Sequence, residues 1–198
     1  MRILNRALFA ALAVSLLSFT ASVQAQVFSE AAGDFSNDAN APTDLGTFAA
    51  GISTISGTSQ SGSEDRDHVT FSVASGFEIT SIQINEFAPT AGGGSFLGFA
   101  NDSVISSSAG DFLFAGLVNV GSADPALDLI AEGAGSFGGQ GFPTTLGAGD
   151  YSFLFNETGA VDANYSAQIT VAASVPEPSS AIVLAGLGLL AARRRRKS

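Results

Sequence analysis

The sequence contains no cysteine, no tryptophan and only one histidine. The absence of cysteine excludes disulfides, thiolate metal sites and thiol nucleophiles. The folded protein must therefore depend on its apolar core alone. A domain of about 150 residues is large enough for this, because it buries roughly 68–70% of the surface that the unfolded chain exposes.

Basic residues are almost absent between the two ends of the chain. Arg66 is the only Lys or Arg between Arg6 and Arg193, whereas positions 26–175 hold 17 acidic residues, a formal net charge of −16 for that stretch. Such a charge repels phosphate backbones, so we expect no nucleic-acid partner. Binding of divalent cations, or simple solubility, is what this charge favours.

Residues 1–25 have the features of a secretory signal. Arg2 and Arg6 form a positive start, an apolar stretch follows over 7–19, and small residues then precede Gln26. The alternative is a membrane-spanning helix, but the apolar run is short and a cleavage sequence follows at once. We expect an N-terminal signal helix that signal peptidase removes by cutting between Ala25 and Gln26.

The C-terminal segment, 175–198, has three parts: the tripeptide Pro-Glu-Pro at 176–178, an uncharged stretch over 179–192 and a basic tail over 193–198. The uncharged stretch would be about 21 Å long as a helix, short of the roughly 30 Å hydrocarbon core, but Arg side chains can reach toward the interface. We therefore predict a short transmembrane helix with its basic end in the cytoplasm and the preceding domain on the far side. The basic anchor is Arg193, Arg194, Arg195 and Arg196.

This layout resembles the PEP-CTERM sorting signal of Gram-negative bacteria. The matching residues are Pro176, Glu177 and Pro178, followed by the apolar stretch and the arginines. The resemblance implies an exosortase that recognises the tripeptide and removes the tail during export, so that Glu177 is part of a substrate and not a catalyst. The alternative is an ordinary tail anchor, which would need the helix and charges but not the tripeptide.

Between the ends, residues 26–174 alternate between apolar and polar positions with period two, as β-strands do. Runs of this kind are short, frequent and separated by Gly, Ser, Asn and Asp, which is typical of a sandwich or jelly roll. We therefore predict an all-β, antiparallel β-sandwich or jelly-roll domain with one solvated face on each sheet. The alternating residues are Val69, Phe71 and Val73; Ile82 and Ile84; Phe112, Phe114 and Val118; Tyr151, Phe153 and Phe155; and Tyr165, Ala167, Ile169 and Val171.

Three further stretches resemble the bacterial pre-peptidase C-terminal domain, a β-sandwich found on secreted proteins. They are GDFSNDANAPTDLG at 33–46, followed by Ser-Gly-Thr at 56–58; DRDHVTFSV at 65–73; and LGAGDYSF at 146–153. The resemblance covers about residues 30–172 and implies the same sandwich fold. Some members of that family bind calcium through the corresponding Asn-Asp element.

Two acidic clusters carry oxygen ligands that suit Ca²⁺, which takes 6–8 oxygens. Their candidate ligands are Asp34, Asn37, Asp38, Asp44, Asp65 and Asp67. The alternative is that Asn and Asp serve here as turn formers, because their side chains bond the local backbone. Calcium is the one cofactor that the sequence suggests, and both interpretations stay open at this point.

Catalytic residues are not evident. His68 lies beside Asp65 and Asp67, but no nucleophile motif accompanies it and a single histidine falls short of the usual zinc sites. Chance pairs of carboxylates are expected in so acidic a domain, and the commonest sugar-stacking residue, tryptophan, is absent. We predict a protein that is not an enzyme.

The sequence thus predicts an exported structural or interaction protein. It would be held briefly in the inner membrane, trimmed by exosortase and placed at the cell surface or outside the cell. The resemblance to the sorting family implies association with the envelope, an extracellular or biofilm matrix, and exopolysaccharide as a partner. The alternatives are a calcium-stabilised polymer- or carbohydrate-binding module and, more remotely, a hydrolase.

Overall fold

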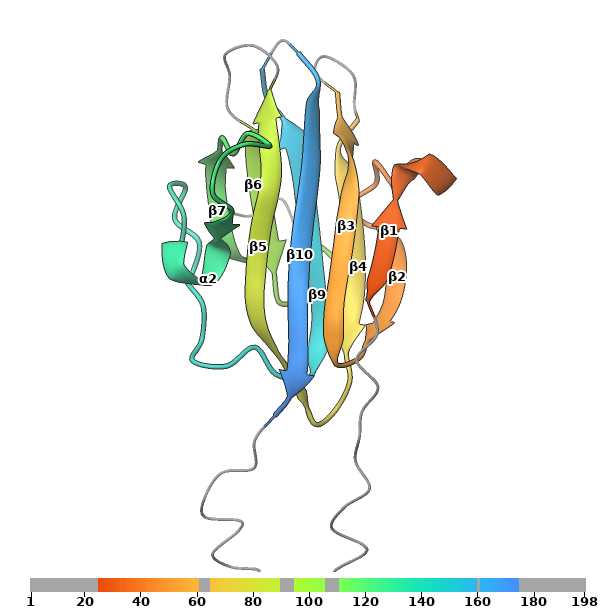
Figure 1. Cartoon of the computed structure of the whole chain (residues 1–198), viewed down its shortest axis with the longest axis vertical. Helices are drawn as coiled ribbons and strands as arrows, with labels where there is room; N and C mark the ends of the chain where they lie inside the picture. The colour runs from red at the N-terminus through yellow and green to blue at the C-terminus, as the bar shows by residue number, and fades with distance from the viewer. Residues whose placement is uncertain (1–24, 61–64, 90–94, 106–110, 160, 175–198) are drawn as a thin grey trace, which may run out of the picture.

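A computed structural model describes residues 25–60, 65–89, 95–105, 111–159 and 161–174. These residues form two five-stranded sheets that pack face to face as a sandwich (Figure 1), with helix limited to two short turns. The predicted all-β sandwich is confirmed. The predicted transmembrane helix at 179–192 and all but the last residue of the signal segment lie outside the described residues. Within the described ranges, no helix has the length and apolar character needed to cross a membrane.

The first sheet has the strand order β1-β3-β10-β5-β8, and the second has the order β2-β4-β9-β6-β7. The first sheet consists of β1 (Gln26–Ser29), β3 (Gly51–Ser59), β10 (Ala163–Ala173), β5 (Phe77–Pro89) and β8 (Leu127–Asp128). The second consists of β2 (Thr43–Phe48), β4 (Asp67–Val73), β9 (Gly149–Glu157), β6 (Ser95–Ala100) and β7 (Phe112–Val118). The helical turns are η1 (Glu30–Ala32) and α2 (Leu129–Glu132).

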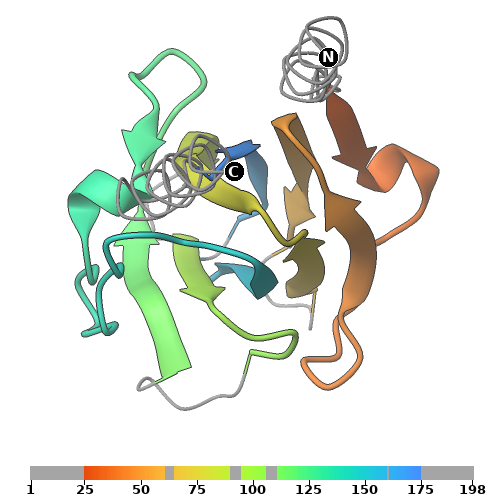
Figure 2. The same cartoon turned by 90° about the horizontal axis from the view of Figure 1, so that it is seen from below.

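The expectation of purely antiparallel sheets is wrong at two edges. Strand β1 pairs in parallel with β3, and β2 pairs in parallel with β4, so both sheets are mixed. In each case a short N-terminal strand is added to the edge of an otherwise antiparallel sheet. The end-on view in Figure 2 shows these first strands, red to orange, on one side of the sandwich and the green region of β7 and α2 on the other.

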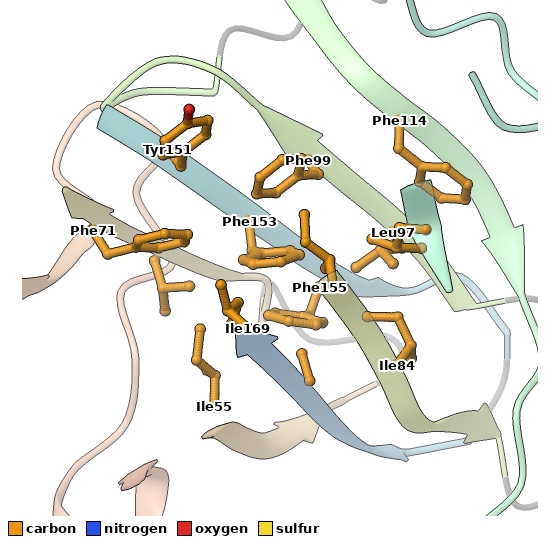
Figure 3. Packing of buried hydrophobic residues seen from close by; sticks show 14 of the residues in the cluster. Ile55, Phe71, Ile84, Leu97, Phe99, Phe114, Tyr151, Phe153, Phe155 and Ile169 are labelled. Atoms are coloured by element: carbon orange, nitrogen blue, oxygen red, sulfur yellow. The ribbon is translucent and has the colours of Figure 1, made fainter. Parts of the chain in front are cut away.

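The core between the sheets is a run of aromatic rings. Ring centroids lie 5.7 Å apart for Phe71 and Tyr151, 5.8 Å for Tyr151 and Phe99, 4.7 Å for Phe99 and Phe153, and 5.3 Å for Phe153 and Phe155. Figure 3 shows these rings with aliphatic side chains of the facing sheet packed against them. The predicted alternation on β4, β5, β9 and β10 is confirmed, because each of those strands places its apolar positions in this core.

Strand β7 departs from its predicted alternation. Phe114 and Val118 face the main core, but Phe112 belongs to a second apolar cluster on the opposite face of the sheet, with Ala100 and Ile105. A register shift between Phe99 and Ala100 on the neighbouring strand accompanies this change. A bulge adds one residue to one strand, so residues on its two sides exchange faces. The outer face of the second sheet is therefore partly apolar, not uniformly solvated as predicted.

Both ends of the described domain lie at the same end of the sandwich (Figure 1). Ser53 of β3 is the partner of Gln26 on one side and of Ile169 on the other, so β1 begins beside the last part of β10. The backbone N–H of Ser174 then donates to the carbonyl of Gly76 at 2.9 Å. The sequence therefore enters and leaves the domain at one end, and the opposite end is free of terminal connections.

Replacing Phe153 by Ala should lower the free energy of unfolding by about 3–5 kcal/mol, because a fully buried ring would leave a cavity between the sheets. The matched control is Phe137→Ala, since the Phe137 side chain is 53% exposed and should cost no more than about 1 kcal/mol. Urea denaturation of both variants measures the difference. Equal losses would contradict the packing described here.

Candidate metal centre

Three carboxylates from two separate parts of the chain meet at one place in the sandwich. Oxygen atoms of Glu30, Asp34 and Asp67 all lie within 4.8 Å of one another. Glu30 begins η1, Asp34 follows that turn, and Asp67 is the first residue of β4. The cluster therefore depends on tertiary structure and not on one loop.

The position of Glu30 is set by hydrogen bonds to two strands. Its Oε2 accepts the backbone N–H of Thr58 at 2.8 Å, and its Oε1 accepts the hydroxyl of Tyr165 at 2.9 Å. Gly57 lies under this carboxylate, and a Cβ at that position would overlap both the Glu30 carboxylate and the Tyr165 hydroxyl. The glycine thus leaves the space into which Glu30 extends.

Asp67 points into the interior because of its place on β4. Val69, Phe71 and Val73 face the core, and side chains alternate along a strand, so Asp67 faces the same way at the strand's end. Its side chain is 0% exposed, and neither carboxylate oxygen has a hydrogen-bond partner. A buried carboxylate without a partner is costly, which makes this the one feature of the cluster that calls for a ligand.

The electrostatics of the cluster reflect burial and like charge. Burial, and then the charge of Glu30, raise the pKa of Asp67 from 3.8 to about 8. Burial, followed by the charges of Asp34 and Glu30, also raises the pKa of the neighbouring Asp65. Burial, followed by the charges of Asp67 and Glu30, raises the pKa of the Tyr165 hydroxyl, which therefore stays protonated as a donor. No basic side chain of the described residues belongs to this group of carboxylates.

The donor set fits a hard divalent cation. Ca²⁺ binds carboxylate oxygens at 2.3–2.6 Å in flexible geometries, so ligands within 4.8 Å of one another can share one ion. Asp34 is exposed and Glu30 is half-buried, which leaves the ion a route from solvent to Asp67. A bound cation would offset the burial of the Asp67 charge and lower its pKa.

The residues predicted as calcium ligands separate into two groups. Asp34 and Asp67 lie in the cluster, and Asp65 lies close enough to sense its charge. Asp38 and Asp44 instead accept the backbone N–H groups of Asn40 and Gly46 at 2.9 and 2.8 Å, as turn formers do. The Oδ1 atom of Asn37 accepts the backbone N–H of Arg66 at 2.8 Å.

Sequence reasoning missed Glu30 and Tyr165. Glu30 carries no motif of its own and reaches the cluster only because β1 pairs in parallel with β3. Tyr165 is held by its ring, which stacks on Phe155 with centroids 4.0 Å apart. Conversely, His68 points away from the cluster, since it neighbours Asp67 on a strand and faces the opposite side.

Comparison with known proteins adds one decisive match. Residues 174–197 match the PEP-CTERM protein-sorting motif. The protein carries an exosortase sorting signal. This signal implies that the protein is exported, processed at the membrane by an exosortase and sorted to the surface. The predicted PEP-CTERM sorting signal is thereby confirmed, and the matched segment contains Pro176, Glu177 and Pro178.

Among solved structures, the chain is similar to the pre-peptidase C-terminal domain of a collagenase from Bacillus anthracis. The TM-score is 0.36 and the identity 18%, over 66% of this chain and 93% of that one. No curated protein matches the sequence.

Calcium should stabilise the protein recovered from cells. At 10 mM CaCl2 we expect the free energy of unfolding to rise by about 1–3 kcal/mol over its value in EDTA, as for an extracellular calcium module with a Kd near 10⁻⁴–10⁻³ M. Asp67→Asn should abolish this response, whereas Asp38→Asn, which changes a turn carboxylate, should preserve it. A calcium response that survives Asp67→Asn would contradict the assignment of the site.

The metal-free protein should lose stability as the pH rises from about 4 to about 8. In this window the folded state keeps the proton on Asp67 while the unfolded state has released it, so raising the pH favours unfolding. Thermal unfolding in EDTA across this range measures the slope, and Asp67→Asn should reduce it. Saturating calcium should also reduce it, because the cation stabilises the ionised carboxylate.

Proposed function

We propose that this is a surface-sorted structural or interaction protein, associated with the cell envelope or an extracellular matrix and without enzymatic activity of its own. The observation that carries this proposal is the PEP-CTERM match over residues 174–197. A signal of this kind is an address for export, so the function of the protein lies outside the cytoplasm.

The proposed route has two cleavages. Signal peptidase cuts between Ala25 and Gln26, the segment 179–192 holds the protein in the inner membrane, and exosortase then acts near Pro176–Pro178. The arginines at 193–196 stay on the cytoplasmic side until the tail is removed. Exopolysaccharide is the partner that we propose for the released protein, because the resemblance to the sorting family implies it.

The shape of the domain supports this role. Strand β10 ends at Ala173, directly before the matched segment, and β1 begins at the same end of the sandwich. The carboxylate cluster lies toward the other end, near Gly57 and Tyr165. A domain attached through its C-terminal segment would thus hold the cluster away from the membrane.

The absence of enzymatic activity is proposed from the arrangement of the titratable groups. His68 and Asp67 face opposite sides of the second sheet, so a carboxylate-oriented base does not form there. Burial lowers the pKa of His68, and the charge of Arg66 lowers it further. The described residues that surround Asp67 offer carboxylates and a protonated tyrosine but no activated nucleophile.

A second candidate is a calcium-stabilised polymer-binding module. The specific observation in its favour is Asp67, a fully buried carboxylate with no hydrogen-bond partner beside two other carboxylates. A cation at this place would hold η1 and the segment after it against β3 and β4. The two candidates are compatible, since a sorted protein can also bind a matrix polymer.

The intact mass of the protein recovered from envelope and culture medium tests the sorting route. We expect a species that begins at Gln26 and lacks the arginine tail. A triple variant, Pro176→Ala with Glu177→Ala and Pro178→Ala, should instead keep the tail and remain in the membrane fraction. Cells that lack the exosortase should give the same result with the unchanged sequence.

An unprocessed wild-type species would contradict this proposal. Retention of Arg193–Lys197 in all fractions would mean a permanent inner-membrane anchor. The matched control is Thr80→Glu, an exposed substitution in the β domain that should leave both cleavages intact.

A further inference from the structure

A pocket on the outer face of the second sheet is separate from the carboxylate cluster. It has a volume of about 320 Å³ and lies over strands β4, β9 and β6. This volume falls at the lower end of the range for small-ligand pockets, about 300–1,000 Å³. Its floor is apolar, formed by Phe96, Phe112 and Leu154, and its polar lining includes Arg66, His68 and Asn156.

Phe112 belongs to the apolar floor because β7 changes face at its start. The rings of Phe96 and Phe112 meet edge to face with centroids 6.0 Å apart. Phe112 lies over Gly98, where a Cβ would overlap its ring. The bulge and the glycine thus add the Phe112 ring to Phe96 and Leu154, which face outward by ordinary alternation on their strands.

The polar side of the pocket is held by the segment that follows η1. The backbone N–H of His68 donates to the carbonyl of Ser36 at 2.9 Å, and the backbone N–H of Arg66 donates to Asn37 Oδ1 at 2.8 Å. Asn37 also lines the pocket, and since its carbonyl oxygen is occupied, its amide NH2 is the group left for a ligand. These two hydrogen bonds therefore fix the backbone positions of Arg66 and His68 in the protein without a ligand.

Two side chains of the pocket, Arg66 and His68, keep polar atoms that make no hydrogen bond with the residues that the structure describes. Arg66 is exposed and is the only basic residue between the two ends of the chain, and no ion pair ties its guanidinium to a described carboxylate. His68 is 6% exposed, and its Nδ1 atom has no hydrogen-bond partner. A guanidinium that makes no ion pair with the described carboxylates, and that lies beside an apolar floor, can pair with a carboxylate of a ligand.

The position of the pocket argues against an extended peptide. Strands β4, β9 and β6 are interior strands of their sheet, so their backbone hydrogen bonds are already made to neighbouring strands. A peptide that binds by strand addition needs a free edge. A compact ligand that carries its own polar groups therefore fits this face better than a peptide that binds through backbone hydrogen bonds to an edge strand.

We infer that the pocket binds one uronate unit of a sparsely charged acidic polysaccharide, with Arg66 pairing with the carboxylate and Phe96 contacting the C–H face of the sugar ring. Asn37 and Asn156 are placed for the ring hydroxyls. The high negative charge of the domain disfavours densely charged polymers, so the favoured ligand carries isolated carboxylates. Because the aromatic floor is phenylalanine and not the larger tryptophan, the charge pair supplies much of the affinity.

This inference rests on the proposed interaction role of the domain and names its ligand. The test uses the protein recovered from cells and culture medium, whether processed or not, and an aldobiouronic acid, a disaccharide of one glucuronate and one xylose, with its uncharged methyl ester as the comparison. Calorimetric titration should show the acid binding at least about tenfold more tightly than the ester, as expected for a charge-assisted pair. Arg66→Gln should remove this preference and Arg66→Lys should keep part of it.

The matched control is Thr80→Glu, which also makes the net charge one unit more negative but lies on β5 in the other sheet. It should bind like the wild-type protein. Equal affinity for acid and ester, no binding of either, equal losses in the control, or binding only of a short peptide with a free C-terminal carboxylate would each overturn the inference. The intact mass of the same preparation reports sorting independently, so the two proposals fail separately.

Discussion

The stacked aromatic rings between the two sheets are the interaction on which the rest of this structure depends. A chain without cysteine has no covalent cross-link to hold a sandwich closed. Here the rings form a continuous path from Phe28 at one edge, through Phe48 and Phe71, to Phe155 and Tyr165 on the other side of the core. Phenylalanine suits this role because it buries a large apolar surface without a polar atom that needs a partner.

The same packing positions the polar features. Tyr165 is part of the aromatic path, and its hydroxyl at the end of that path holds Glu30. Asp67 begins the inward-facing row of β4, two residues before its first apolar member, Val69, so it is buried by its position and not by any affinity for the core. Its neighbours Arg66 and His68 line the pocket on the opposite face. The short stretch 65–68 thus contributes Asp67 to the carboxylate cluster on the inner face of the sheet, and Arg66 and His68 to the pocket on its outer face.

Much of this arrangement follows from residue order alone. The interior strands alternate cleanly because one face is buried, and their pattern predicted β4, β9 and β10. The sequence pattern did not predict the edge strands β1 and β2, because they are short and their parallel pairing is set by tertiary contacts. The change of face at Phe112 depends on a single bulge, which leaves no periodic signal. Glu30 was missed for a related reason, because no local pattern says which strand η1 will pack against.

The predicted calcium ligands show that residue type alone does not distinguish a metal ligand from a turn-forming residue. Asp38 and Asp67 are the same residue type in similar polar surroundings along the sequence. Asp38 bonds the backbone two residues later, whereas Asp67 is enclosed by the sandwich. Only burial separates the two roles, and burial is a property of the folded chain.

The place of β10 in its sheet has a mechanical consequence. This strand leads directly to the C-terminal segment, and it is paired along its length with β3 on one side and β5 on the other, both antiparallel. A pull between that segment and the far end of the domain would run parallel to the strands. Both ladders would then be loaded in shear, so that many backbone hydrogen bonds must yield together instead of one after another. Loading in shear therefore makes the domain resist extension along the strand axis better than loading that opens one hydrogen bond at a time.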